Sequence, residues 1–174
     1  MLLNLSDVLT SEGRVVKRTA DLEMTSFDSR LGSFPIIEKQ PVNFTFTNVG
    51  EHRAKVEGST RMKLSAACDR CMEETTVILD LTFDRVVTSP EYHTEDEEAD
   101  DKSYMEGYQL NVETFIYHEI LVNWPVKILC KEDCKGVCSK CGQNLNEREC
   151  GCDTFVPDPR MAAIKDIFCR DKEV

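Results

Sequence analysis

Eight cysteines constrain this sequence more than any other feature. Six of them lie between Cys130 and Cys152 with the spacing Cys-x3-Cys-x3-Cys-x2-Cys-x8-Cys-x-Cys, and two more form Cys68-Asp69-Arg70-Cys71. Short Cys-x2-4-Cys loops present two sulfurs from one turn, and tetrahedral Zn2+ takes four such ligands. The pattern predicts two tetrathiolate zinc sites per chain, with the ligands Cys68, Cys71, Cys130, Cys134, Cys138, Cys141, Cys150 and Cys152.

The division of these ligands into two sites follows from their reach along the chain. The last four cysteines of the late cluster are close enough to form one local knuckle, which leaves the first two to join Cys68 and Cys71. Such a site connects the two halves of the chain and closes a loop of about sixty residues. The alternative groups the first four cysteines of the late cluster and leaves two pairs without partners. Cys169 is left over, either as a small apolar residue or as a free thiol.

The coordination indicates a structural role for the metal. Disulfides are the alternative, but the odd number of cysteines and the lack of a signal peptide favour metal binding in a reducing, cytoplasmic environment. Four thiolates saturate zinc and leave no position for water or substrate, and iron fits the same donors. No phosphate-binding loop or nucleophile motif is present, and the three histidines are scattered. We therefore expect no enzymatic activity and no small-molecule substrate.

The net charge of −11 is unevenly distributed along the chain. The stretch from Glu91 to Asp101 holds seven acidic residues and no basic one, which is typical of a solvated linker. The alternative is that this stretch attracts a basic protein partner. No run approaches the roughly twenty apolar residues of a membrane helix, so no membrane partner is expected.

The first ninety residues show the period of two that is typical of strands. Val42, Phe44 and Phe46 share one face, and the clearest face runs from Val77 to Phe83. We predict an α+β protein: an antiparallel β domain over residues 1–90, barrel-like or a strongly twisted sheet, that carries the first cysteine pair. An acidic linker follows over 91–103. Residues 104–174 are expected to form a helical and Cys-rich zinc-binding module packed on the β domain.

Two helices are expected in that module. Asn111 can cap a helix that runs to about Asn123, with Glu113 in the first turn and Trp124-Pro125 at the end. A last helix is expected after Asp158-Pro159, because an N-cap residue is followed there by proline.

A hairpin is expected around Gly58, with a loop such as Glu57-Gly58-Ser59. An odd loop of this kind lets the apolar residues of both strands face one core. The same register places four cations on the opposite face, where they form a candidate phosphate-binding patch or a solvated edge that discourages aggregation. These residues are Arg53, Lys55, Arg61 and Lys63.

The late cluster resembles a known family. The string CKGVCSKCGQNLN at 134–146, with NWPV before it at 123–126 and Cys150-Gly151-Cys152 after it, is similar to the YceD family, and Cys68-Asp69-Arg70-Cys71 fits as well. The resemblance covers essentially the whole chain. Members of this family are large ribosomal RNA subunit accumulation proteins, so the resemblance implies a role in making or stabilising large-subunit ribosomal RNA.

Two functions are therefore compared. The first is a non-enzymatic ribosome-biogenesis factor whose zinc-stabilised scaffold holds large-subunit rRNA or an early large-subunit ribosomal protein. The cationic patch favours RNA, whereas the acidic composition favours a basic ribosomal protein. The alternative is a redox-sensitive zinc protein or holdase chaperone, in which oxidation of the cysteines releases zinc and exposes apolar surface.

Overall fold

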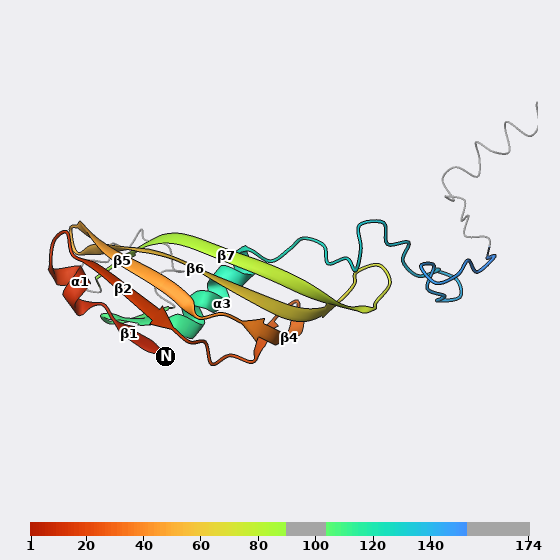
Figure 1. Ribbon diagram of the computed structural model, residues 1–174, viewed down its shortest axis with the longest axis horizontal. Helices are drawn as coiled ribbons and strands as arrows, with labels where there is room; N and C mark the ends of the chain where they lie inside the picture. Colours follow the sequence, from red (N-terminus) through yellow and green to blue (C-terminus); the bar gives the residue numbers. More distant parts are fainter. Residues whose placement is uncertain (90–103, 153–174) are drawn as a thin grey trace, which may run out of the picture. The chain divides into compact units, whose positions relative to one another are not determined.

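The computed structural model describes residues 1–89 and 104–152 (Figure 1). The elements are β1 (Leu2–Asn4), α1 (Ser6–Thr10), β2 (Val15–Ala20), β3 (Ser26–Ser29), β4 (Gly32–Lys39), β5 (Val42–Gly50), β6 (Arg53–Ala67), β7 (Glu74–Thr88), β8 (Met105–Glu106), β9 (Gln109–Asn111) and α3 (Val112–Val122). The acidic stretch, Cys169 and the helix expected after Asp158 all lie outside the described residues. In the part that the structure describes, no helix is long and apolar enough to cross a membrane.

The chain divides into two compact units. The first comprises Met1–Cys68 and Glu73–Cys130, and it contains all the strands and both helices named above. The second comprises Asp69–Met72 and the chain from Lys131 onward. This grouping assigns α3 to the unit of the sheet, whereas the sequence suggested a boundary before residue 104. The domain division proposed from the sequence stays a prediction.

The larger sheet is antiparallel and open. β6 lies at its centre: β7 pairs with all fifteen residues of one edge, while β5 and β4 follow one another along the other edge. β2 pairs with β5 and β3 with β4, so the described strands do not close a ring. A barrel requires its outermost strands to pair. The expectation of a barrel-like sheet was therefore wrong, and the antiparallel sheet is open.

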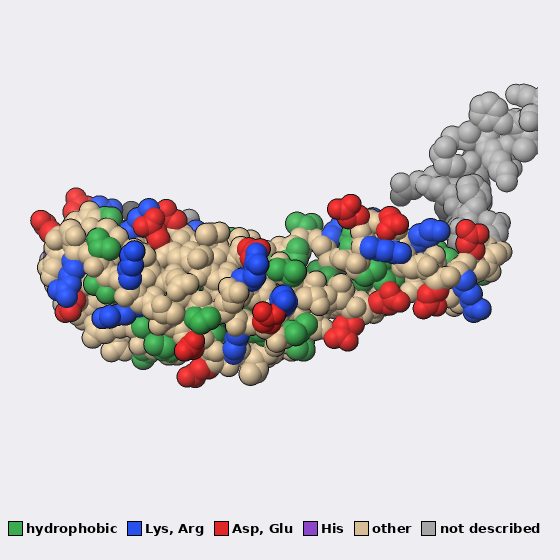
Figure 2. All heavy atoms as spheres, in the orientation of Figure 1, with side chains coloured by type: hydrophobic (Ala, Val, Ile, Leu, Met, Phe, Trp, Pro, Cys, Tyr) green, Lys and Arg blue, Asp and Glu red, His purple; other side chains and the backbone are tan. Residues whose placement is uncertain are grey.

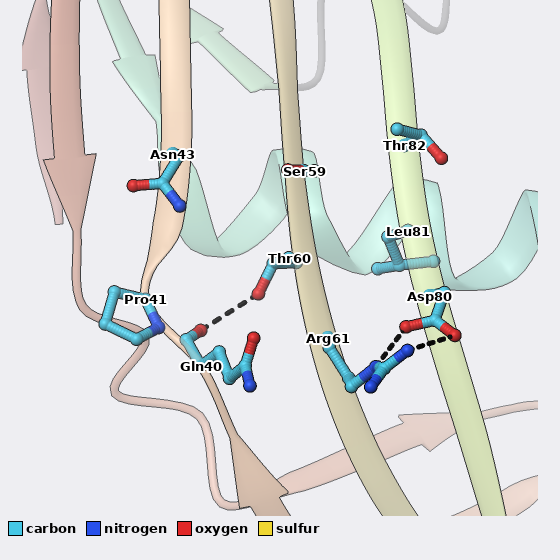
Figure 3. A pocket seen from close by; sticks show the side chains of 9 residues that line it. All are labelled: Gln40, Pro41, Asn43, Ser59, Thr60, Arg61, Asp80, Leu81 and Thr82. Carbon is cyan, nitrogen blue, oxygen red and sulfur yellow. Dashed lines mark hydrogen bonds and ion pairs between the residues drawn. The ribbon is translucent and has the colours of Figure 1, made fainter.

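The junction between β4 and β5 interrupts the pairing on that edge of β6. The Gln40 N–H donates to the Arg61 carbonyl at 2.9 Å, and the Thr60 hydroxyl donates to the Gln40 carbonyl at 2.9 Å. A hollow of about 290 Å³ lies at this interruption. Figure 3 shows the side chains that line it, among them Pro41 and Asn43. The two short strands thus act as one bent strand along β6.

The hairpin expected at Gly58 does not form. β6 continues from Arg53 to Ala67 without a turn, and Gly58 lies in its middle, opposite Phe44 on β5 and Phe83 on β7. The prediction of the turn was wrong, although the predicted sharing of faces holds, because a continuous strand and an odd loop give the same parity. The Phe83 ring occupies the space beside Gly58 where a side chain would lie, and its centroid is 5.4 Å from that of the Phe44 ring.

Gly58→Ala is expected to lower the free energy of unfolding by about 1–3 kcal/mol, as overpacking of a filled core does. An added Cβ would lie 2.6 Å from the Phe83 ring and still closer to the backbone oxygen of Asn43. Urea denaturation measures the change. Ser59→Ala, at the exposed neighbouring position, is the control. Equal stability of the two variants would contradict this packing.

α3 covers the apolar face of this sheet and forms as predicted. The Asn111 side chain accepts a hydrogen bond from the Thr114 N–H at 3.3 Å, and the helix ends at Asn123. Phe115, fully buried, packs edge-on against Phe83 with ring centroids 5.0 Å apart. The Glu113 carboxylate accepts from the Glu23 N–H at 2.7 Å, which ties the first turn of the helix to the connection between β2 and β3. α3 thus covers much of the apolar sheet face, and the same core also includes Val8 and Leu9 of α1.

Candidate metal centres

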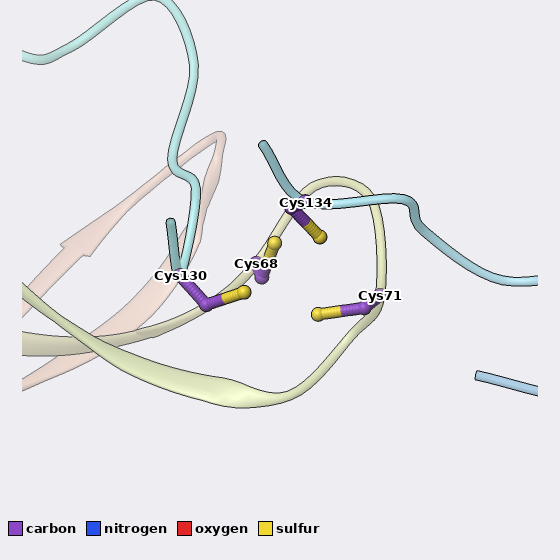
Figure 4. Close-up of side chains that lie close together, drawn as sticks. All are labelled: Cys68, Cys71, Cys130 and Cys134. Atoms are coloured by element: carbon purple, nitrogen blue, oxygen red, sulfur yellow. The ribbon is translucent and has the colours of Figure 1, made fainter. Parts of the chain in front are cut away.

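The first cysteine group is assembled from two distant parts of the sequence. Cys68 and Cys71 belong to the turn between β6 and β7, and Cys130 and Cys134 follow α3. Their four sulfur atoms lie within 4.8 Å of one another and point toward a common centre (Figure 4). Cys68, Cys71 and Cys134 are buried, and Cys130 is half-buried. This arrangement can hold one metal ion.

Backbone contacts hold the turn of the first group in place. The Arg70 guanidinium donates to the Cys134 carbonyl at 2.8 Å, and the Arg70 carbonyl accepts from the Val137 N–H at 3.1 Å. Gly136 has a φ of 78°, and a Cβ there would lie 3.0 Å from the Arg70 oxygen. Only glycine meets both conditions without strain. Sequence reasoning gave no role to Arg70, because a residue between two cysteines carries no signal for a contact made sixty-four positions away.

The second group is local, and a tight turn builds it. Cys138 donates its N–H to the Gln143 carbonyl at 2.8 Å, and the Gly142 N–H donates to the Cys138 carbonyl at 2.9 Å. Val137 and Asn144 form a β-bridge beside this turn. The sulfurs of this group again lie within 4.8 Å of one another, and its members are Cys138, Cys141, Cys150 and Cys152. The structure therefore places the eight cysteines in the two groups that the spacing suggested.

Hydrogen bonds polarise the thiols of the second group in opposite directions. The backbone N–H groups of Cys141 and Lys140 stabilise the Cys138 thiolate and lower its pKa to about 6. Hydrogen bonds with the Cys141 and Cys150 side chains, together with burial, raise the pKa of Cys152 to about 12. Four thiols this close cannot all ionise without a compensating cation. A dication supplies that compensation. In the first group, the Asn146 amide donates an N–H to the Cys134 sulfur at 3.3 Å and stabilises negative charge there.

The donor set fits zinc in both groups. Four cysteine sulfurs in one cluster match the soft, closed tetrahedral coordination of structural Zn2+. The eight described cysteines form no disulfide with one another. Each group can therefore bind one metal ion, and the sulfur donors would fill its coordination.

The four candidate phosphate-binding cations point to the outer face of the sheet, and each has a carboxylate beside it. Lys63 lies 2.6 Å from Glu38, and Lys55 lies 2.7 Å from Glu57 and 3.0 Å from Asp84. Arg61 makes two hydrogen bonds to Asp80, drawn in Figure 3, and these lower the pKa of the Asp80 carboxyl. Arg53 pairs with Glu51. The patch predicted from the sequence is thus present as a face but neutralised by ion pairs.

Comparisons with known proteins relate the chain to one family. A family model described as "Large ribosomal RNA subunit accumulation protein YceD" matches residues 56–168, a range that includes both cysteine groups. The chain is also similar to "Large ribosomal RNA subunit accumulation protein YCED homolog 1, chloroplastic" from Arabidopsis thaliana, with 24% identity over 127 residues. That alignment covers 58% of this chain and 40% of the relative. No solved structure matches the chain.

Proposed function

The chain belongs to the YceD family, whose members act in the accumulation of large-subunit ribosomal RNA, and on this premise we propose that it is a non-enzymatic ribosome-biogenesis factor. The observation that carries the proposal is the family match over residues 56–168, which spans the two cysteine groups. In this proposal two zinc ions stabilise the scaffold, and the scaffold holds a partner during assembly of the large subunit.

The donor chemistry supports a scaffold rather than a catalyst. Coordination by four thiolates leaves a zinc ion no site at which it could activate water or polarise a substrate. The two metals would instead hold irregular backbone in place. Residues 131–152 contain no named helix or strand, so in this proposal metal coordination reinforces the turn hydrogen bonds and the single β-bridge that order them.

The charge distribution favours a basic ribosomal protein over RNA as the direct partner. A phosphate that approached the outer sheet face would have to displace Asp80 from Arg61 or Glu38 from Lys63. Acidic and basic side chains are interspersed on the face shown in Figure 2. With a net charge of −11, the chain repels nucleic acid at long range and attracts a cationic protein.

A binding experiment tests this choice. The zinc-loaded chain is titrated separately with individual purified large-subunit ribosomal proteins and with fragments of large-subunit rRNA, at low and high salt. We expect one basic ribosomal protein to bind with an affinity that falls as salt rises, and the rRNA fragments to bind at least about tenfold more weakly.

Direct binding of rRNA through the cationic patch would give a different result. Tight rRNA binding that the double substitution R61Q/K63Q weakens would return the role of partner to RNA and make the cationic patch its site. Thr76→Ala, on the neighbouring strand β7, is the control for that variant. Depletion of the chain from cells tests the wider role separately, with a reduced ratio of large-subunit to small-subunit rRNA as the expected result.

A further inference from the structure

The two cysteine groups differ sharply in their access to solvent. In the first group Cys68, Cys71 and Cys134 are 0%, 5% and 3% exposed. In the second only Cys138 is buried, Cys141 is exposed, and the remaining two are half-buried. Two sites with identical donor atoms therefore present different barriers to an incoming ligand.

The first group is covered by backbone segments that several hydrogen bonds hold together. The Arg70 side chain and carbonyl bind the backbone of Cys134 and Val137, and the Leu145 N–H donates to the Gly136 carbonyl at 2.8 Å. The Asn146 amide reaches the Cys134 sulfur at 3.3 Å. A competing ligand would have to break several of these hydrogen bonds before it reached the Cys134 sulfur.

The second group opens on a hollow of about 470 Å³. The walls of this hollow include Cys141, Cys150 and Cys152, together with Gln143 and Arg148. Its volume is in the range of a small-molecule pocket. On this side the segment with the last two cysteines is tied to the turn by a hydrogen bond from Arg148 Nε to Gln143 Oε1 at 3.0 Å. A small ligand can therefore approach three of the four sulfurs without unfolding the turn.

We propose that the second group is an exchangeable metal site, which trades its zinc with small competing ligands, while the first group retains its zinc as a permanent part of the scaffold. Exchange here is ligand substitution: thiolates leave the metal as the incoming ligand binds it, and no electron is transferred. Loss of this zinc would loosen residues 138–152, while the hydrogen bonds of Arg70 to the backbone of Cys134 and Val137 would still cover the first group. The inference rests on metal binding by both groups and is independent of the partner in ribosome assembly.

Metal release and cysteine labelling test the proposal together. The two-zinc chain is mixed with the chromogenic chelator 4-(2-pyridylazo)resorcinol, pulsed with iodoacetamide at intervals and analysed by peptide mass spectrometry. We expect two phases of equal amplitude. Cysteines of the second group should be alkylated at least about tenfold faster than those of the first, as exposure dictates. Cys169 is left out of the comparison because it lies outside the described residues.

Three variants make the assignment specific. Cys141→Ser should abolish the fast phase and leave the slow phase unchanged. Arg148→Ala should accelerate the fast phase alone, and Lys131→Ala, also at an exposed position, should change neither phase. A single phase with both groups labelled together would overturn the proposal. So would early labelling of Cys68 or Cys71, or resistance of both zinc ions to the chelator.

Discussion

Cys71→Ser is expected to remove one of two zinc ions and to lower the free energy of unfolding by roughly 4 kcal/mol or more, the range in which loss of a structural metal falls. The serine hydroxyl stays protonated and is a poor zinc ligand. The sulfur that it replaces is 5% exposed and lies within 4.8 Å of the other three sulfurs. In the folded chain this metal also offsets the entropy cost of closing the loop of about sixty residues between Cys71 and Cys130, and the variant loses that compensation.

Metal content by mass spectrometry and urea denaturation under reducing conditions measure the two effects. Glu132→Ser, an exposed substitution between Cys130 and Cys134, is the matched control and should keep both zinc ions and full stability. Retention of two zinc ions by the Cys71 variant would show that the first group does not bind metal through all four of its sulfurs.

The local features of the fold could be predicted because they depend on near neighbours. The alternation through Val42, Phe44 and Phe46 marks one buried face, and all three residues are at most 1% exposed. The cap at Asn111 and the stop at Trp124-Pro125 bracket α3 within one residue of its observed ends. Periodicity and capping are written in consecutive residues, so a single sequence reveals them.

The course of β6 could not be read in the same way. A glycine followed by a serine resembles a turn, and both a turn of three residues and a continuous strand give the parity that the sequence shows. What decides between them is the pair of rings from Phe44 and Phe83 on the neighbouring strands. Those residues lie fourteen and twenty-five positions from Gly58, and no local pattern records their contact.

Ion pairing on the sheet surface was hidden for the same reason. The sequence shows four cations at alternating positions but does not show which strands lie beside them. Register brings Asp80 of β7 opposite Arg61, and Glu38 of β4 opposite Lys63. An apparent binding patch thus became a surface of exposed ion pairs, and those to Asp80, Asp84 and Glu38 join neighbouring strands. Of the two partners that the sequence left open, these ion pairs favour a basic protein over RNA.

Phe115→Ala is expected to lower the free energy of unfolding by about 3–5 kcal/mol, the range for removal of a buried phenylalanine side chain. Its ring is 1% exposed, and its centroid lies 5.0 Å from that of Phe83, 5.2 Å from Tyr104 and 6.0 Å from Phe44. The cavity that alanine leaves would open between α3 and the centre of the sheet, where none of these rigid rings can fill it without moving backbone.

Urea denaturation of the zinc-loaded chain measures this loss, with Val122→Ala as the control because that side chain is on the same helix and 68% exposed. Equal losses for the two variants would mean that α3 does not close the core. The Phe115 variant should still bind two zinc ions, whereas the Cys71 variant should lose one while its aromatic core stays filled. The two substitutions therefore separate stability that comes from packing from stability that comes from metal.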